Sequence, residues 1–132
     1  MINYLWVGLG GALGSVARVW MAELIARYCG SWLPFGTLLV NISGSFVIGF
    51  LATGVGPEGR WMASAYGRSF LMAGICGGYT TFSSFSLQTL NLLRAGEWLY
   101  AGGNVLLSVL FCMVGVWLGY LLGAALNSAK GG

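Results

Sequence analysis

The chain has 132 residues, of which 58% are hydrophobic and only 7% are charged. No soluble domain of this length could bury so much apolar surface, whereas long apolar stretches with few charges are typical of membrane-spanning helices. The net charge of +3 comes from basic residues spread singly along the chain, which excludes a nucleic-acid-binding patch. Because the chain has no His and no Asp, familiar hydrolytic and proton-relay chemistry is unavailable, and we expect no enzyme.

The pattern predicts an all-α integral membrane protein with a single domain over residues 1–132 and four transmembrane helices. The spans are expected at about residues 3–28, 35–54, 68–93 and 98–125. In the first span the charged residues, among them Arg18 and Glu23, come late, where their side chains can reach the membrane interface. Small residues of this span predict the close approach of another helix: Gly8, Gly10, Gly11, Gly14 and Ser15.

The second span places polar side chains along one helical face. Thr37, Asn41 and Ser45 follow at spacings of i, i+4 and i+8, which aligns a hydroxyl, an amide and a hydroxyl. Hydrogen bonding between helices would explain the two hydroxyls alone. An amide at mid-span is costly without partners or water, so we favour a polar track that lines a pathway.

The third span is expected to be broken near Gly77–Thr80. A glycine pair, the β-branched Thr80 and Thr81 and a run of hydroxyls weaken the helix there. Backbone groups freed at membrane depth must be buried in protein, face a wet cavity or bind an ion. Phe82 and Phe85 follow on one face. Ordinary packing is the simpler reading of this pair, and lining of a pore by their ring edges is the alternative.

The fourth span carries Asn104 and Ser108 as a second polar stripe, and overlapping GxxxG repeats at Gly115, Gly119 and Gly123. The candidate lining of a pathway is therefore rich in neutral donors and has no carboxylate certain to lie at mid-depth, which favours an anion. Backbone carbonyls at the break favour a hard monovalent cation held separately. The lining candidates are Asn41, Thr80, Thr81, Ser83, Ser84, Ser108 and Tyr120.

The basic residues are balanced between the two sides of the membrane. Arg60, Arg68 and Lys130 lie on one side of the predicted topology, and Arg18, Arg27 and Arg94 lie on the other. The positive-inside rule then selects no orientation, so insertion in both orientations and an antiparallel dimer become plausible. Four spans enclose little of a pathway, which also favours a second copy.

Three motifs carry a family resemblance. They are Gly10-Gly-Ala-Leu-Gly-Ser-Val-Ala-Arg18, Gly36-Thr-Leu-Leu-Val-Asn41-Ile-Ser-Gly-Ser-Phe46 and Gly74-Ile-Cys-Gly-Gly-Tyr-Thr-Thr-Phe-Ser-Ser-Phe85. In order and spacing the chain resembles, over almost its whole length, the small bacterial fluoride exporters of the CrcB/Fluc type. The resemblance implies a multi-pass protein of the bacterial inner membrane that passively exports fluoride, lowers cytoplasmic fluoride and gives fluoride resistance.

The same resemblance implies a dual-topology homodimer in the lipid membrane, with two narrow pores. Asn41 would donate to fluoride, Phe82 and Phe85 would present ring edges, and further hydroxyls would continue the track: Thr81, Ser83, Ser84 and Ser108. The carbonyls of Gly77 and Thr80 would hold a structural sodium ion at the dimer interface, and Arg18 would lie by an aqueous vestibule. Gln88 departs from the pattern, because a Glu is frequent at that position, so no titratable group is assigned there.

Two other functions compete with this hypothesis. A small multidrug-type, proton-coupled antiporter also has four spans, but it needs a membrane-embedded carboxylate, for which Glu23 is the candidate. A membrane scaffold without transport would explain the glycine surfaces but not the broken helix or Asn41.

Overall fold

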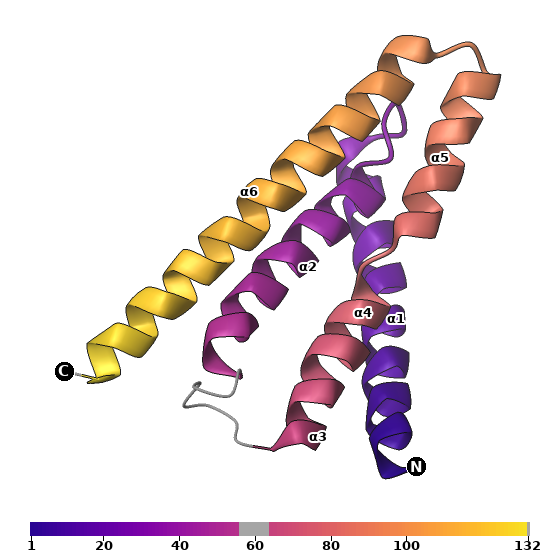
Figure 1. The fold of residues 1–132 in the computed structure, drawn as a ribbon. Coiled ribbons are helices and arrows are strands. Elements are labelled where there is room, and N and C mark those ends of the chain that lie inside the picture. The colour runs from indigo at the N-terminus through magenta and orange to yellow at the C-terminus, as the bar shows by residue number, and fades with distance from the viewer. Residues whose placement is uncertain (56–63, 132) are drawn as a thin grey trace.

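The computed structural model describes residues 1–55 and 64–131, and this part of the chain is helical without any strand. Residues 56–63, which include Arg60 of the charge comparison, and residue 132 lie outside the described part. The long helices are α1 (Ile2–Cys29), α2 (Phe35–Gly54) and α6 (Trp98–Gly131). Between α2 and α6 come four shorter pieces, namely α3 (Ala65–Arg68), η1 (Ser69–Cys76), α4 (Gly77–Tyr79) and α5 (Phe82–Arg94), as Figure 1 shows.

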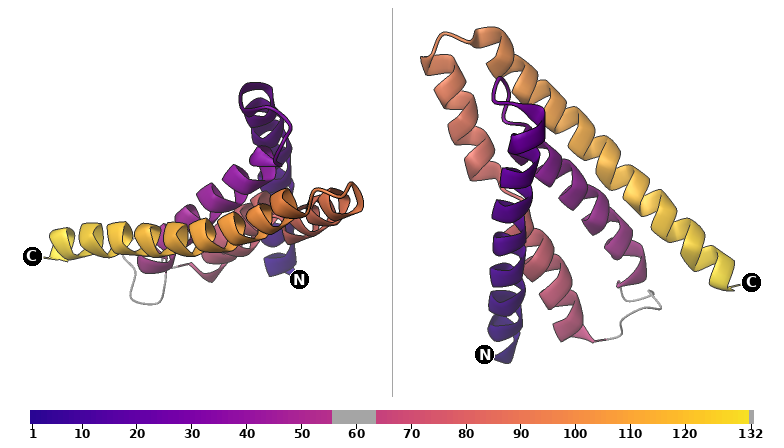
Figure 2. Two further views of the ribbon diagram at one scale, coloured as in Figure 1. Left: turned by 90° about the horizontal axis from the view of Figure 1, so that it is seen from above. Right: turned by 180° about the vertical axis from the view of Figure 1, so that it is seen from behind.

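The helices α1, α2 and α6 are each long and apolar enough to cross a membrane. The pieces from α3 to α5 run in one general direction and are interrupted between α4 and α5 (Figures 1 and 2). At the α-helical rise of about 1.5 Å per residue, residues 82–94 extend about 20 Å. Residues 65–79 extend at most about 22 Å, because η1 is a π-helix, which rises less per residue. Neither piece alone covers a hydrocarbon core of about 30 Å.

Glycines set the distance between neighbouring helices. A Cβ atom at Gly14 of α1 would collide with the carbonyl oxygen of Ile75, and one at Gly119 of α6 would collide with that of Phe46. The prediction of close packing is therefore right for Gly14 and Gly119. Gly8 has open space around its Cβ position, so the expectation of a contact there is wrong for this chain taken alone. The backbones of α1 and η1, and of α2 and α6, thus lie in direct contact.

The substitution Gly119→Ala tests the contact between α2 and α6. The added methyl group has no room against the backbone of Phe46, so we expect the thermal midpoint of the purified protein to fall by roughly 5 °C or more. Gly102→Ala, on the same helix but with no atom within 4 Å of its Cβ position, is the control and should leave the midpoint unchanged or slightly higher. Equal thermal midpoints for Gly119→Ala and Gly102→Ala would contradict the close contact between α2 and α6.

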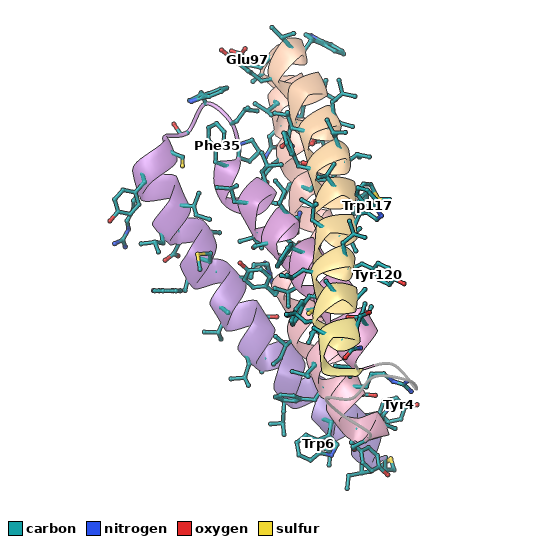
Figure 3. The ribbon with its side chains drawn as sticks, turned by 90° about the vertical axis from the view of Figure 1, so that its left-hand side faces the viewer. Tyr4, Trp6, Phe35, Glu97, Trp117 and Tyr120 are labelled. Carbon is teal, nitrogen blue, oxygen red and sulfur yellow. The ribbon has the colours of Figure 1, made fainter. Side chains whose placement is uncertain are left out.

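The exterior of the chain is apolar and part of its interior is polar. Large apolar side chains on α1 and α6 are exposed, whereas Asn104 and Ser108 are buried. Figure 3 shows aromatic side chains projecting outward from α6, with Tyr4 and Trp6 near one end of the molecule and Glu97 at the other. This distribution suits a chain that is surrounded by lipid and keeps its polar groups inside.

Candidate functional site

The interruption lies at Thr80 and Thr81, at the C-terminal end of the predicted range. Both residues have extended backbones, with φ −81° and ψ 156° at Thr80 and φ −150° and ψ 112° at Thr81. The Thr81 hydroxyl then caps α5 by accepting a hydrogen bond from the backbone N–H of Ser84 (3.2 Å). Gly77 is helical, so the break begins later than the glycine pair predicted. Of that pair, Gly78 packs closely against α1, whereas a Cβ atom at Gly77 would make only an ordinary contact, at 3.8 Å from the carbonyl oxygen of Met72.

A two-point hydrogen bond from α2 holds the break. The backbone N–H of Thr81 donates to Asn41 Oδ1 (2.7 Å), and Asn41 Nδ2 donates to the carbonyl oxygen of Thr81 (3.0 Å). Backbone groups that lost their helical partners are thereby satisfied within the protein. Asn41 Nδ2 carries two hydrogens, so one N–H of this side chain remains available for a ligand.

From the other side, α1 holds the same segment. Arg18 Nε donates to the carbonyl oxygen of Gly78 (3.1 Å), and the Ser15 hydroxyl lies 3.4 Å from the same oxygen. The resemblance implied that Arg18 lies by an aqueous vestibule. In the structure its Nε lies at the break, where it bonds to Gly78. A Cβ atom at Gly78 would lie 2.5 Å from the carbonyl oxygen of Gly11, so glycine at position 78 lets α1 come this close, whereas a Cβ atom at Gly11 would meet no atom within 4 Å.

A cavity of about 390 Å³ lies beside the break, between α2, the α4–α5 junction and α6. Among the described residues that line it, none is charged. It brings together most of the predicted site residues: Asn41, Gly77, Thr80, Thr81, Phe82, Phe85 and Ser108. Ser45 of the predicted polar track lines it as well, whereas Ser83 and Ser84 do not. Lining residues to which the sequence patterns gave no site role include Cys76 and Cys112, which share helix faces with predicted ones.

Two hydroxyls of this lining are free to serve a ligand. The Thr80 hydroxyl donates to the carbonyl oxygen of Cys76 (3.0 Å), and that of Thr81 is occupied with Ser84 (3.1 Å). Within the described part of the chain, the hydroxyls of Ser45 and Ser108 make no hydrogen bond. Together with the second N–H of Asn41 they form the donor set of the cavity.

The two phenylalanines both line this cavity. Their rings are 5.3 Å apart between centroids and inclined by 53°. Phe85 is half-buried, but Phe82 is 78% exposed. A ring at that exposure does little packing within one chain.

A neighbouring polar cluster lies beside Phe85. Buried Asn104 donates from Nδ2 to the Thr89 hydroxyl (2.9 Å), which in turn donates to the carbonyl oxygen of Phe85 (2.8 Å). Gln88 Oε1 is buried and has no hydrogen-bond partner among the described residues.

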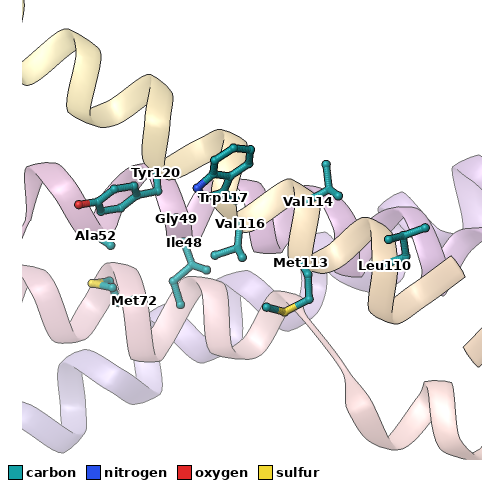
Figure 4. A pocket seen from close by; sticks show the side chains of 10 residues that line it. All are labelled: Ile48, Gly49, Ala52, Met72, Leu110, Met113, Val114, Val116, Trp117 and Tyr120. Atoms are coloured by element: carbon teal, nitrogen blue, oxygen red, sulfur yellow. The ribbon is translucent and has the colours of Figure 1, made fainter. Parts of the chain in front are cut away.

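A second and larger hollow, of about 670 Å³, is apolar. It lies between α2, η1 and α6, and Figure 4 shows the side chains that line it, including Met72, Met113 and Trp117. Tyr120 lines this hollow and not the polar cavity, so its predicted place on the polar track is wrong. Glu23 is exposed on α1 and lines neither space. In the described residues no group of three or more His, Cys, Asp or Glu side chains could hold a metal ion.

Comparison with known proteins agrees with the motifs. The family model described as "CrcB-like protein, Camphor Resistance (CrcB)" matches residues 5–120. The chain belongs to the CrcB family. A relative from Opitutus terrae is 58% identical over 131 residues, which cover 99% of both chains. Relatives from Methylocella silvestris (52% identical, covering 98% of this chain and 99% of the relative) and Rhodospirillum rubrum (55% identical, covering 96% and 98%) also match over nearly their whole length.

All three relatives carry the name "Fluoride-specific ion channel FluC". The CrcB family is thus a family of channels and not of enzymes. Together with its apolar helices, membership of this family identifies the chain as a multi-pass protein of the bacterial inner membrane.

Proposed function

We propose that this protein is a fluoride-selective passive channel that exports fluoride from the cytoplasm. The observation that carries the proposal is the match of 58% identity over 99% of the chain to a fluoride-specific ion channel. A negative cell interior drives anions outward, and a weak acid accumulates inside as its anion, so export needs no fuel. The antiporter alternative receives no support, because its required carboxylate, Glu23, lies outside the cavity.

The polar cavity provides the chemistry for a small anion. Free donors from Asn41, Ser45 and Ser108 replace part of the hydration shell of fluoride, and the uncharged lining presents no carboxylate to repel it. The positive ring edges of Phe82 and Phe85 face the ion along the same path. Thr80 and Thr81 act indirectly, since their hydroxyls are already occupied within the protein.

The functional unit is a dual-topology homodimer with two pores. The pieces from α3 to α5 form the fourth span, because together, but not separately, they cover the hydrocarbon core. The exposure of Phe82 and the open apolar hollow of Figure 4 are surfaces that a second, inverted copy would cover. With Arg18 bonded at the break, the other basic residues divide three against two, which leaves little bias toward either orientation.

The break provides oxygen ligands for a structural sodium ion. Within the described residues, the carbonyl oxygens of Gly77 and Thr80 accept no hydrogen bond. Their helical donors are used elsewhere, because the N–H of Thr81 donates to Asn41 and the N–H of Ser84 donates to the Thr81 hydroxyl. Two such carbonyls from each of two copies make an oxygen set that suits a hard monovalent cation and needs no acidic side chain. The ion would join the two breaks and neutralise their carbonyl dipoles.

Replacing Ser108 by Ala tests the donor set. Loss of one hydrogen bond to an anion is worth about 1.5 kcal/mol, so we expect fluoride efflux to fall roughly tenfold while the helices stay folded. Ser128→Ala, on the exposed surface near the end of α6, is the control. Equal efflux rates in both variants and the original protein would remove Ser108 from the pathway.

Expression in a bacterium that lacks its own fluoride exporter tests the function in cells. The protein is expected to restore growth in millimolar fluoride, and an expressed, membrane-inserted protein that gave no resistance would oppose the proposal.

A further inference from the structure

The carbonyl oxygen of Gly78 has lost its helical partner. In an unbroken helix it would accept a hydrogen bond from the N–H of Phe82, but Phe82 begins α5 beyond the extended residues. Arg18 supplies the replacement through Nε at 3.1 Å, and Ser15 adds a weaker contact at 3.4 Å. A bond from a guanidinium is charge-assisted and therefore stronger than the neutral bond that was lost.

The carbonyls around the break are satisfied selectively. Cys76 accepts from Thr80, Gly78 accepts from α1, and Thr81 accepts from Asn41. The carbonyls left without a donor in the described structure include those of Gly77 and Thr80, which flank the turn that Arg18 holds. Of the two carbonyls between the proposed ligands, that of Gly78 accepts from Arg18, whereas that of Tyr79 accepts no hydrogen bond among the described residues. The side chains that hold the break leave the carbonyls of Gly77 and Thr80 open.

We propose that Arg18 is a positioning residue for the sodium site: its hydrogen bond to Gly78 fixes the α4 turn so that the Gly77 and Thr80 carbonyls stay available to the ion. This inference rests on the proposed function, which includes the sodium ion. Arg18 touches neither the ion nor fluoride in this role, and it acts through the backbone of Gly78.

A positioning role and a purely electrostatic role of Arg18 predict opposite changes in sodium affinity when its charge is removed. A positive charge close to a sodium site weakens sodium binding, so loss of that charge alone would tighten it. Loss of a hydrogen bond that preorganises the carbonyls would weaken sodium binding. The direction of the change therefore identifies the mechanism.

The test measures the thermal midpoint of the purified full-length protein against sodium concentration, with the ionic strength held by choline chloride and without fluoride. Sodium that binds the folded dimer raises the midpoint by mass action. We expect Arg18→Met to shift the half-saturating sodium concentration upward at least tenfold. Arg18→Lys keeps the charge and one donor group, and we expect a shift of about threefold. Arg27→Met removes the same charge from the exposed end of α1 and should shift nothing.

An unchanged or lower half-saturating concentration in Arg18→Met would overturn the inference, as would an original protein that sodium does not stabilise. If Arg18→Met fails to fold, an unshifted Arg18→Lys overturns it. Failure of the proposed function is a separate result, namely an original protein that passes no fluoride.

Discussion

Asn41→Asp is expected to reduce fluoride efflux from proteoliposomes at least a hundredfold. One carboxylate oxygen can still accept the hydrogen bond from the N–H of Thr81. The other replaces the NH₂ group that donated to the carbonyl oxygen of Thr81, so two oxygen atoms then face each other. It also places a negative charge on the cavity wall. At about 5 Å and an effective dielectric constant of about 20, repulsion of an anion amounts to about 3 kcal/mol, which is more than a hundredfold in rate.

The control for this variant is Asn91→Asp, which makes the same replacement at an exposed position of α5 that lines neither space. Its efflux should equal that of the original protein. Size-exclusion chromatography must show that the Asn41→Asp protein is assembled, since the lost bond also loosens the break. Normal throughput in an assembled Asn41→Asp protein would remove Asn41 from the pathway.

Phe82→Ile is expected to lower fluoride efflux at least tenfold, more than its packing cost explains. Phe82 packs little within one chain, where 78% of it is exposed, and isoleucine retains much of the apolar contact with a second copy but has no ring edge to face the ion. Efflux and thermal midpoint are measured on the same preparation, so that a loss of flux can be separated from a loss of fold.

Phe111→Ile is the matched change on α6, where the ring is 45% exposed and lines neither cavity. It should leave efflux unchanged. If Phe82→Ile and Phe111→Ile both conduct like the original protein, the ring edge of Phe82 plays no part in conduction.

Local sequence patterns predicted those features that depend on helical periodicity. Asn41 and Ser45, four residues apart, do lie on one face and line the same cavity. The close-packing role of Gly119 also follows from its spacing, because a GxxxG repeat places its small residues in one line. Tyr120, only one residue further along, lies on another face and lines the apolar hollow instead.

Other features depend on which helices meet and could not be read from local patterns. The bonds between Asn41 and Thr81 join residues 40 positions apart, and the bond from Arg18 to Gly78 joins residues 60 apart. Local patterns placed Asn41 toward the ion, whereas the folded chain uses its carbonyl oxygen and one of its two N–H groups to satisfy the broken helix. Likewise, the glycines near the break suggested its position, but the capping hydroxyl of Thr81 determines where α5 begins.

The most direct test of the account is anion efflux from liposomes that carry the purified protein and are loaded with fluoride or chloride, with valinomycin added to remove the electrical limit. The account predicts rapid loss of fluoride and retention of chloride. Retention of both anions by liposomes that contain the assembled dimer, or equal loss of both, would contradict a fluoride-selective passive channel.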